Sequence, residues 1–112
     1  IWATWSAPSQ WILPKFQSLY DQLQSREDLE IFSMNVDEDP SLARPFMAKH
    51  GYTFPVIPAF TFVGQLVGFL SVPRLWIVDP SGKWTWEQVG FDATATDWEE
   101  DVLKKLASSA IA

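Results

Sequence analysis

The sequence predicts an α/β domain in which a mixed central β-sheet is flanked by helices. A helical pattern, an apolar strand and a second helix start follow one another, which is the order of a parallel crossover unit. Later in the chain, two β-rich runs flank a Pro-Ser-Gly turn and a final helix follows, which predicts an antiparallel hairpin in the same sheet. At 112 residues the chain has the size of one domain, so we expect residues 1–112 to form a single domain.

The first predicted helix runs from about Pro8 to Gln24. Pro8 falls in the first turn, where a missing N–H costs nothing, whereas Pro14 lies inside the helix. The buried face is predicted from apolar residues that recur at the 3.6-residue helical period: Ile12, Phe16, Leu19 and Leu23.

The middle of the chain is predicted to hold a buried strand, two short helices and a short strand. Residues 29–37, LEIFSMNVD, are apolar and β-prone without a helical period, which favours a buried strand. Residues 39–51 begin with an Asp-Pro helix start and end at a glycine, which predicts a short helix. A short strand is expected near residues 55–57 and a short helix near residues 63–69.

The hairpin is predicted from residues 74–79, RLWIVD, and residues 83–90, KWTWEQVG. Strict alternation in the second run would place Trp84 and Trp86 on one face. Residues 96–99, TDWE, have the Thr-x-x-Glu form of a capping box, which predicts the start of the last helix.

The composition excludes several classes of protein. The net charge is −6 and the eight Lys and Arg form no basic patch, so nucleic acid is not an expected partner. No apolar run is long enough to cross a bilayer, and the first residues lack the pattern of a signal peptide, so we expect a soluble segment without membrane insertion. The chain has no cysteine, which excludes a disulfide, a thiolate nucleophile and a Cys-ligated metal.

Three separated motifs resemble the TlpA/ResA-like group of thiol-disulfide oxidoreductases, the redoxins with a thioredoxin-like fold. That family reads Phe-Trp-Ala-Thr-Trp-Cys-x-Pro-Cys at the end of its first strand, and residues 1–9 here read IWATWSAPS. Residues 34–57, MNVDEDPSLARPFMAKHGYTFPVI, are similar to the second strand, the second helix and the Phe-Pro-Val segment of the family. Residues 71–84, SVPRLWIVDPSGKW, are similar to its Gly-Val-Pro-Thr-x-Phe-x-Ile-Asp-x-x-Gly-Lys motif, with Ser71 in place of glycine.

The resemblance implies a site at the start of the first helix. Ser6 and Ser9 stand where the family has its two redox cysteines, and Pro73 stands where it has a cis-proline. A groove for an extended peptide would be lined by Trp5, Ala7, Pro8 and Val72. The resemblance also implies disulfide-containing or dithiol protein partners, no cofactor or metal, and an extracytoplasmic, periplasmic location.

The chain departs from the family pattern in three ways. A serine hydroxyl cannot form the mixed disulfide that exchange requires, so the Ser-Ala-Pro-Ser form is redox-inactive as written. Ile12 stands where many members carry a glutamate that moves protons for the buried thiol. The family domain begins with a hairpin and most of a central strand before the position of Ile1, so we expect this chain to be an N-terminally truncated domain.

Two functions remain open from the sequence. One is a thiol-disulfide oxidoreductase domain in a double-serine form, and the other is a naturally redox-inactive thioredoxin-like module that binds peptides or proteins. A hydrolase nucleophile at Ser6 is disfavoured, because His50 is explained by its place at a helix end. The acidic run of residues 37–39 lacks the spacing of a calcium loop and is interpreted as a solvated loop with Asp39 as a helix cap.

Overall fold

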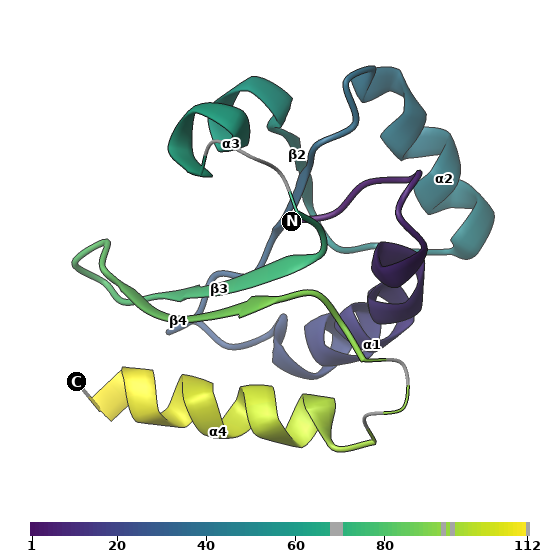
Figure 1. The fold of residues 1–112 in the computed structure, drawn as a ribbon. Coiled ribbons are helices and arrows are strands. Elements are labelled where there is room, and N and C mark those ends of the chain that lie inside the picture. Colours follow the sequence, from purple (N-terminus) through teal and green to yellow (C-terminus); the bar gives the residue numbers. More distant parts are fainter. Residues whose placement is uncertain (68–70, 93, 95, 112) are drawn as a thin grey trace.

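The computed structural model describes residues 1–67, 71–92, 94 and 96–111. Four α-helices, four strands and one 3-10 helix are assigned to these residues, in the α/β order that the sequence predicts (Figure 1). The last two residues of the helix expected near 63–69 lie outside the described residues. The elements are α1 (Ala7–Leu23), β1 (Ser33–Asn35), η1 (Pro40–Leu42), α2 (Ala43–His50), β2 (Val56–Pro58), α3 (Phe60–Val67), β3 (Arg74–Val78), β4 (Trp84–Val89) and α4 (Trp98–Ile111).

The strands form two pairs, and the first residues of the chain lie between them. β1 pairs with β2 in parallel, and β3 pairs with β4 in antiparallel orientation. The Trp2 N–H donates to the Met34 carbonyl at 3.0 Å, and the Val36 N–H donates to the Trp2 carbonyl at 2.9 Å. On the other side, the Arg74 N–H donates to the Ile1 carbonyl at 3.0 Å. In the part of the chain described, the parallel and antiparallel pairings that the sequence predicts thus form two two-stranded sheets, which Ile1 and Trp2 link by backbone hydrogen bonds.

Two clusters of buried apolar side chains hold the helices to these strands. The larger cluster combines side chains of α1, α2 and α4 with Trp2 and Phe54. The smaller cluster packs Ala59 and Val63, at the start of α3, against Ala3 and Val36. Helix α1 contributes the face that its period predicts, because Ile12, Leu13, Phe16, Leu19 and Leu23 are all buried.

Strand β1 is shorter than the predicted run of residues 29–37. A strand extends only as far as a neighbouring strand pairs with it, and β2 pairs through only three residues, Val56 to Pro58. Residues 29–32 precede the strand and line a cavity that is described below. Val36 and Asp37, which follow the strand, are both buried.

The predicted alternation of tryptophans in β4 is wrong because the strand contains an irregularity. Ile77 lies opposite Trp86 and Val78 lies opposite Trp84, so Thr85 has no counterpart in the register. Trp84 stacks on Trp76 with ring centroids 4.4 Å apart, whereas Trp86 packs against the larger core cluster. One inserted residue thus places the two tryptophans on opposite faces.

The helix ends agree with the predicted signals, with one shift. Asp39 caps η1 by accepting from the Ser41 N–H at 3.0 Å, and Gly51 ends α2 in the left-handed conformation with φ 71°. The first backbone bond of α4 runs from the Asp101 N–H to the Asp97 carbonyl at 3.0 Å. Asp97, rather than Thr96 of the predicted capping box, is therefore the N-cap of α4.

Replacing Gly51 with alanine is expected to lower the free energy of unfolding by about 1 kcal/mol, because a Cβ is strained at positive φ. An added Cβ at Gly51 meets nothing within 4 Å, so the loss would come from the backbone conformation alone. Gly64→Ala is the matched control, since this glycine lies inside α3 with equally open surroundings and should gain up to about 1 kcal/mol. Urea unfolding of both variants measures the change in the free energy of unfolding, which should be negative for Gly51→Ala and positive for Gly64→Ala. Equal changes in the two variants would contradict the prediction.

Candidate functional site

The N-terminus of α1 holds both serines in buried positions. Ser6 is the N-cap, and its Oγ accepts from the Ser9 N–H at 3.2 Å. Ser9 lies in the first turn with an exposed fraction of 0%, and its Oγ accepts from the Ala3 N–H at 3.4 Å. Pro8 lies between them in the first turn, where it needs no hydrogen-bond acceptor. The sequence therefore starts a helix here and points two small polar side chains inward.

The Val72–Pro73 segment lies against this helix start. The Val72–Pro73 peptide bond is cis, which confirms the predicted conformation. The Ser6 hydroxyl donates to the Val72 carbonyl at 3.4 Å, across 66 positions of sequence. Pro73 is buried, and its carbonyl accepts from the Gly90 N–H at 2.7 Å, which ties it to the end of β4. The structure thus brings Ser6, Ser9 and Pro73 into one region.

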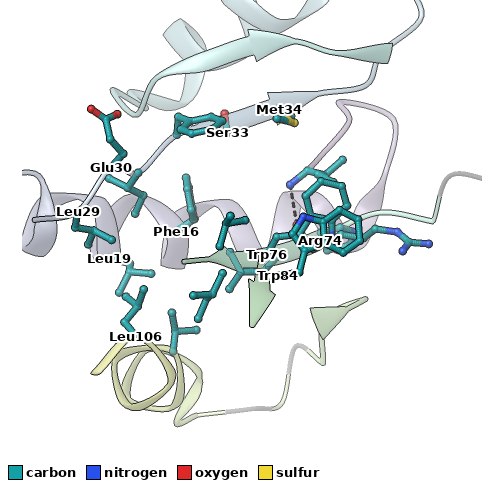
Figure 2. A pocket seen from close by; sticks show the side chains of 18 of the residues that line it. Phe16, Leu19, Leu29, Glu30, Ser33, Met34, Arg74, Trp76, Trp84 and Leu106 are labelled. Atoms are coloured by element: carbon teal, nitrogen blue, oxygen red, sulfur yellow. Dashed lines mark hydrogen bonds between the residues drawn. The ribbon is translucent and has the colours of Figure 1, made fainter. Parts of the chain in front are cut away.

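The remaining predicted site residues surround this region to different degrees. Trp5 is 65% exposed and Ala7 is also exposed, whereas Pro8 and Val72 are half-buried. A cavity of about 660 Å³ (Figure 2) is lined by Pro73 but by neither Trp5 nor Ser6, so it is a separate feature. Among the residues of the predicted peptide surface, Trp5 therefore presents the most accessible large side chain.

Asp37 is a site residue that the sequence interpretation missed. It was expected in a solvated loop, but its exposed fraction is 2%. Its carboxylate accepts from the Thr4 N–H at 3.0 Å, from the Thr4 hydroxyl at 2.7 Å and from the Asn35 amide at 2.7 Å. Glu38 and Asp39 are exposed, as expected for the loop. Asp37 therefore fixes the segment that leads into Trp5 and Ser6.

The segment before α1 is also held from the helix side. The Gln10 amide donates to the Thr4 carbonyl at 2.9 Å, and the Ser6 N–H donates to the Ala3 carbonyl at 3.3 Å. Thr4 is thus bonded through its N–H, its hydroxyl and its carbonyl. The one signal in the sequence for this arrangement is the position of Asp37, which directly follows a buried strand.

Catalytic partners for a serine nucleophile are not assembled here. The Ser6 hydroxyl accepts from the Ser9 N–H and donates to the Val72 carbonyl, which are both backbone groups. The imidazole of His50 instead stacks on the ring of Tyr52 at a centroid distance of 5.5 Å and lies tilted against the ring of Phe46 at 4.5 Å. This arrangement does not support a hydrolase.

The described residues contain neither a metal-binding cluster nor a helix that could span a membrane. Within residues 1–67, 71–92, 94 and 96–111, no three His, Cys, Asp or Glu side chains are grouped so that they could hold a metal ion. Among the same residues, no helix is both long enough and apolar enough to cross a bilayer. Ile12, at the position of the family's glutamate, is a buried apolar residue of α1.

The arrangement is suited to a pair of thiols, although it carries hydroxyls. A helix N-terminus presents free N–H groups and the positive end of the helix dipole, and both stabilise an anion. A thiol at position 6 would therefore have a lowered pKa, and a second thiol at position 9 could resolve a mixed disulfide. A paired site at the start of α1 against a cis-proline defines a thioredoxin-like protein by its architecture.

Comparisons with known proteins agree with this class. The chain is 31% identical over 108 residues to the thiol-disulfide oxidoreductase ResA of Geobacillus thermodenitrificans, and 26% identical over 110 residues to ResA of Geobacillus kaustophilus. Each alignment covers 96% of this chain, and the chain spans 59% of the length of each of these relatives. No family profile matches the chain.

Solved structures share the fold. A protein described as the thiol:disulfide interchange protein DsbE from Chlorobium tepidum has a TM-score of 0.78 at 20% identity, covering 96% of this chain and 74% of its own. StoA from Bacillus subtilis has a TM-score of 0.72 at 19% identity, covering 88% of this chain and 75% of its own. The fold is therefore thioredoxin-like, and the sequence is similar to those of the two ResA proteins over almost all of this chain.

Proposed function

We propose that this chain is a thiol-disulfide oxidoreductase domain in a redox-inactive Ser-Ala-Pro-Ser form. The observation that carries the proposal is the pairing of Ser6 and Ser9 at the N-terminus of α1, with the Ser6 hydroxyl 3.4 Å from the carbonyl of Val72. The reaction of the cysteine form would be reduction or exchange of disulfides in partner proteins. A partner segment would lie along Trp5, Ala7, Pro8 and Val72.

The chemistry depends on sulfur at both positions. Exchange begins when a thiolate attacks a disulfide sulfur and expels the other sulfur as a thiolate, and a second thiol then displaces the mixed disulfide. Ser6 would supply the attacking position because it is the N-cap, and Ser9 the resolving position because it is fully buried. A serine hydroxyl at a helix N-terminus remains protonated near neutral pH and forms no bond of this kind.

We expect the double variant Ser6→Cys/Ser9→Cys to reduce the interchain disulfides of insulin in the presence of dithiothreitol. Its rate should exceed the dithiothreitol background at least tenfold, because the helix N-terminus lowers the pKa of a thiol at position 6. The measurement is the turbidity of the precipitating insulin B chain.

The single variants are the matched controls. Ser6→Cys alone should trap a mixed disulfide without turnover, and Ser9→Cys alone should stay at background because position 9 is fully buried. A folded double variant that forms its disulfide but does not exceed background would contradict the proposal.

A naturally redox-inactive binding module is the second candidate function. Both hydroxyls are used in the structure, Ser6 as a helix cap and Ser9 as an acceptor for the Ala3 N–H. The 65% exposure of Trp5 leaves a large amphipathic side chain accessible beside them. An aromatic side chain of this kind contributes strongly to binding, so the serine form retains a surface for an extended peptide.

Under this second function, Trp5→Ala should weaken binding of a cysteine-free, valine- and threonine-rich decapeptide about tenfold, the size of one interface anchor. Trp84→Ala is the matched control, because Trp84 is 44% exposed and stacks on Trp76 of the same hairpin, away from Trp5. Isothermal titration calorimetry compares the two variants with the unsubstituted chain. Equal affinities of the two variants for the peptide would show that Trp5 does not contribute to the peptide-binding surface.

The partners and location follow from the same proposal. Proteins that contain disulfides or dithiols are the expected partners, since the two ResA relatives carry the name of that activity. An extracytoplasmic, periplasmic location is where such disulfides persist, and we propose it for this protein.

A further inference from the structure

Five of the seven tryptophans in the chain have contacts that explain their positions. Three of them donate the indole N–H to another side chain at distances between 2.6 and 3.1 Å, namely Trp2, Trp76 and Trp98. The ring of Trp84 stacks on that of Trp76 (Figure 2), and Trp86 packs against the larger core cluster. These five side chains therefore stabilise the core or the hairpin.

Trp5 and Trp11 are the other two tryptophans, and they are 65% and 51% exposed. In the part of the chain that the structure describes, neither indole N–H has a hydrogen-bond acceptor and neither ring contacts another aromatic ring. Tryptophan is only a moderate helix former, so the place of Trp11 in α1 does not by itself favour an indole. The contacts of the described residues thus give Trp11 no structural role.

Trp11 lies on the same face of α1 as Ala7, which belongs to the proposed peptide surface. The two residues are about one helical turn apart, so Trp11 lies about 6 Å further along the helix axis. Ala7 and Trp11 are both exposed, as is Pro14 in the following turn. An exposed apolar stripe formed by Ala7, Trp11 and Pro14 therefore continues the proposed peptide surface along α1.

The charge of this stripe favours a polypeptide over other kinds of ligand. Lys15 is the one charged residue among residues 7–17. A single cation cannot neutralise the phosphates of a nucleic acid or of an anionic lipid surface. An indole instead combines apolar faces with one N–H donor, which suits the apolar side chains and unpaired carbonyls of an extended polypeptide.

We propose that Trp11 is a second aromatic anchor of the peptide surface and selects partner segments with an apolar side chain two positions beyond the residue that lies at Ala7. The proposal rests on the peptide surface of the proposed function and adds to it a residue that determines specificity. An extended segment advances about 3.3 Å per residue, so it covers the distance from Ala7 to Trp11 in about two residues. Side chains two positions apart in such a segment point to the same side, so both contact the stripe.

The test holds the partner segment at the site through a disulfide at position 6. The Ser6→Cys variant, as its mixed disulfide with glutathione, is equilibrated with a ten-residue peptide that has a central cysteine and leucine at every second position from it. The peptide thiolate displaces glutathione as a thiolate and takes its place in the mixed disulfide, so no oxidant or reductant is consumed. Mass spectrometry of the two mixed disulfides gives the equilibrium constant of this exchange.

We expect the additional substitution Trp11→Ala to lower this equilibrium constant about tenfold, the size of one interface anchor. Trp84→Ala is the matched control, since Trp84 is 44% exposed but lies on the hairpin, and it should change the constant less than about twofold. With a second peptide that has threonine in place of leucine, Trp11→Ala should also change the constant less than about twofold, because the apolar contact is missing.

Each other result would overturn the inference. If Trp11→Ala leaves the constant unchanged while Trp5→Ala lowers it, the peptide surface of the proposed function stands and Trp11 is not part of it. If neither substitution lowers the constant, the peptide surface and this inference both fail. An equal effect of Trp11→Ala with both peptides would show that Trp11 does not contact an apolar side chain. A dimer that Trp11→Ala dissociates in sedimentation would assign Trp11 to a contact between two copies.

A second measurement applies if Trp11→Ala does not fold. The Ser6→Cys variant is labelled with 5-fluorotryptophan, and the fluorine resonance of Trp11 is assigned from the conservative substitution Trp11→Phe. A shift of this resonance in the leucine-peptide disulfide, relative to the glutathione disulfide, supports the contact. An unchanged resonance overturns it.

Discussion

Phe54→Ala is expected to lower the free energy of unfolding by about 3–5 kcal/mol, the range for removing a buried phenylalanine. Phe54 is 2% exposed and lies in the larger core cluster. Its ring meets Phe16 edge-on at a centroid distance of 4.9 Å and Tyr52 at 5.4 Å. The truncation leaves a cavity between α1 and the segment before β2, because neither partner ring can move into the space without losing its own contacts.

Phe62→Ala serves as the control for this prediction. Phe62 belongs to α3 and is 53% exposed, so its truncation in the described chain should change the free energy of unfolding by less than about 1 kcal/mol. Urea unfolding monitored by far-ultraviolet circular dichroism measures the free energy of unfolding of both variants, and we expect their m values to be equal. Equal destabilisation by the two substitutions would show that Phe54 is not a central core residue.

Asp37→Ala is expected to lower the free energy of unfolding by about 3 kcal/mol, the cost of leaving several buried donors without an acceptor. The variant removes the acceptor of the Thr4 N–H, the Thr4 hydroxyl and the Asn35 amide together. Because Thr4 leads directly into Trp5 and Ser6, the site should loosen as well. In the Ser6→Cys/Ser9→Cys background, insulin reduction should therefore fall at least threefold at a temperature where the protein is fully folded.

Glu38→Ala is the matched control for Asp37, because the neighbouring side chain is exposed. Its effect on the free energy of unfolding should remain within about 0.5 kcal/mol, and insulin reduction should be unchanged. A loss of stability in Asp37→Ala without any loss of activity would show that Asp37 supports the fold alone. Equal behaviour of Asp37→Ala and Glu38→Ala would contradict the hydrogen-bond network itself.

The local signals along the chain predicted the helices well. The period of apolar residues gave the buried face of α1, and the predicted bounds of Pro8 and Gln24 differ by one residue at each end from those observed. The Asp-Pro start and the Gly51 stop bracket η1 and α2 as expected. Such signals act within one or two helical turns, so a single sequence is sufficient to find them.

The strands were predicted less accurately because pairing decides where a strand ends. The run of residues 29–37 has the composition of a strand throughout, but β2 pairs with only three of its residues. The irregularity at Thr85 is equally invisible in a pattern of alternating residues, and it sends Trp84 and Trp86 to opposite faces. Both outcomes depend on the register of a neighbouring strand.

For the candidate site, too, the sequence predicted some residues and missed another. The structure brings Ser6, Ser9 and Pro73 together at the start of α1, and the peptide bond before Pro73 is cis. Asp37 was missed because its neighbours in sequence, Glu38 and Asp39, are solvated and made a loop the ordinary interpretation.

By itself, the sequence determined the order of elements and the helix signals at Asp39 and Gly51, and it predicted the paired site at the start of α1. Only the tertiary structure decided the burial of Asp37 and the hydrogen bonds by which Ile1 and Trp2 link the two strand pairs. The physical reason is the range of the interactions. Helix periods and caps are set by residues a few positions apart, whereas the bond between Asp37 and Thr4 joins positions 33 apart, and Ile1 meets Arg74 across 73.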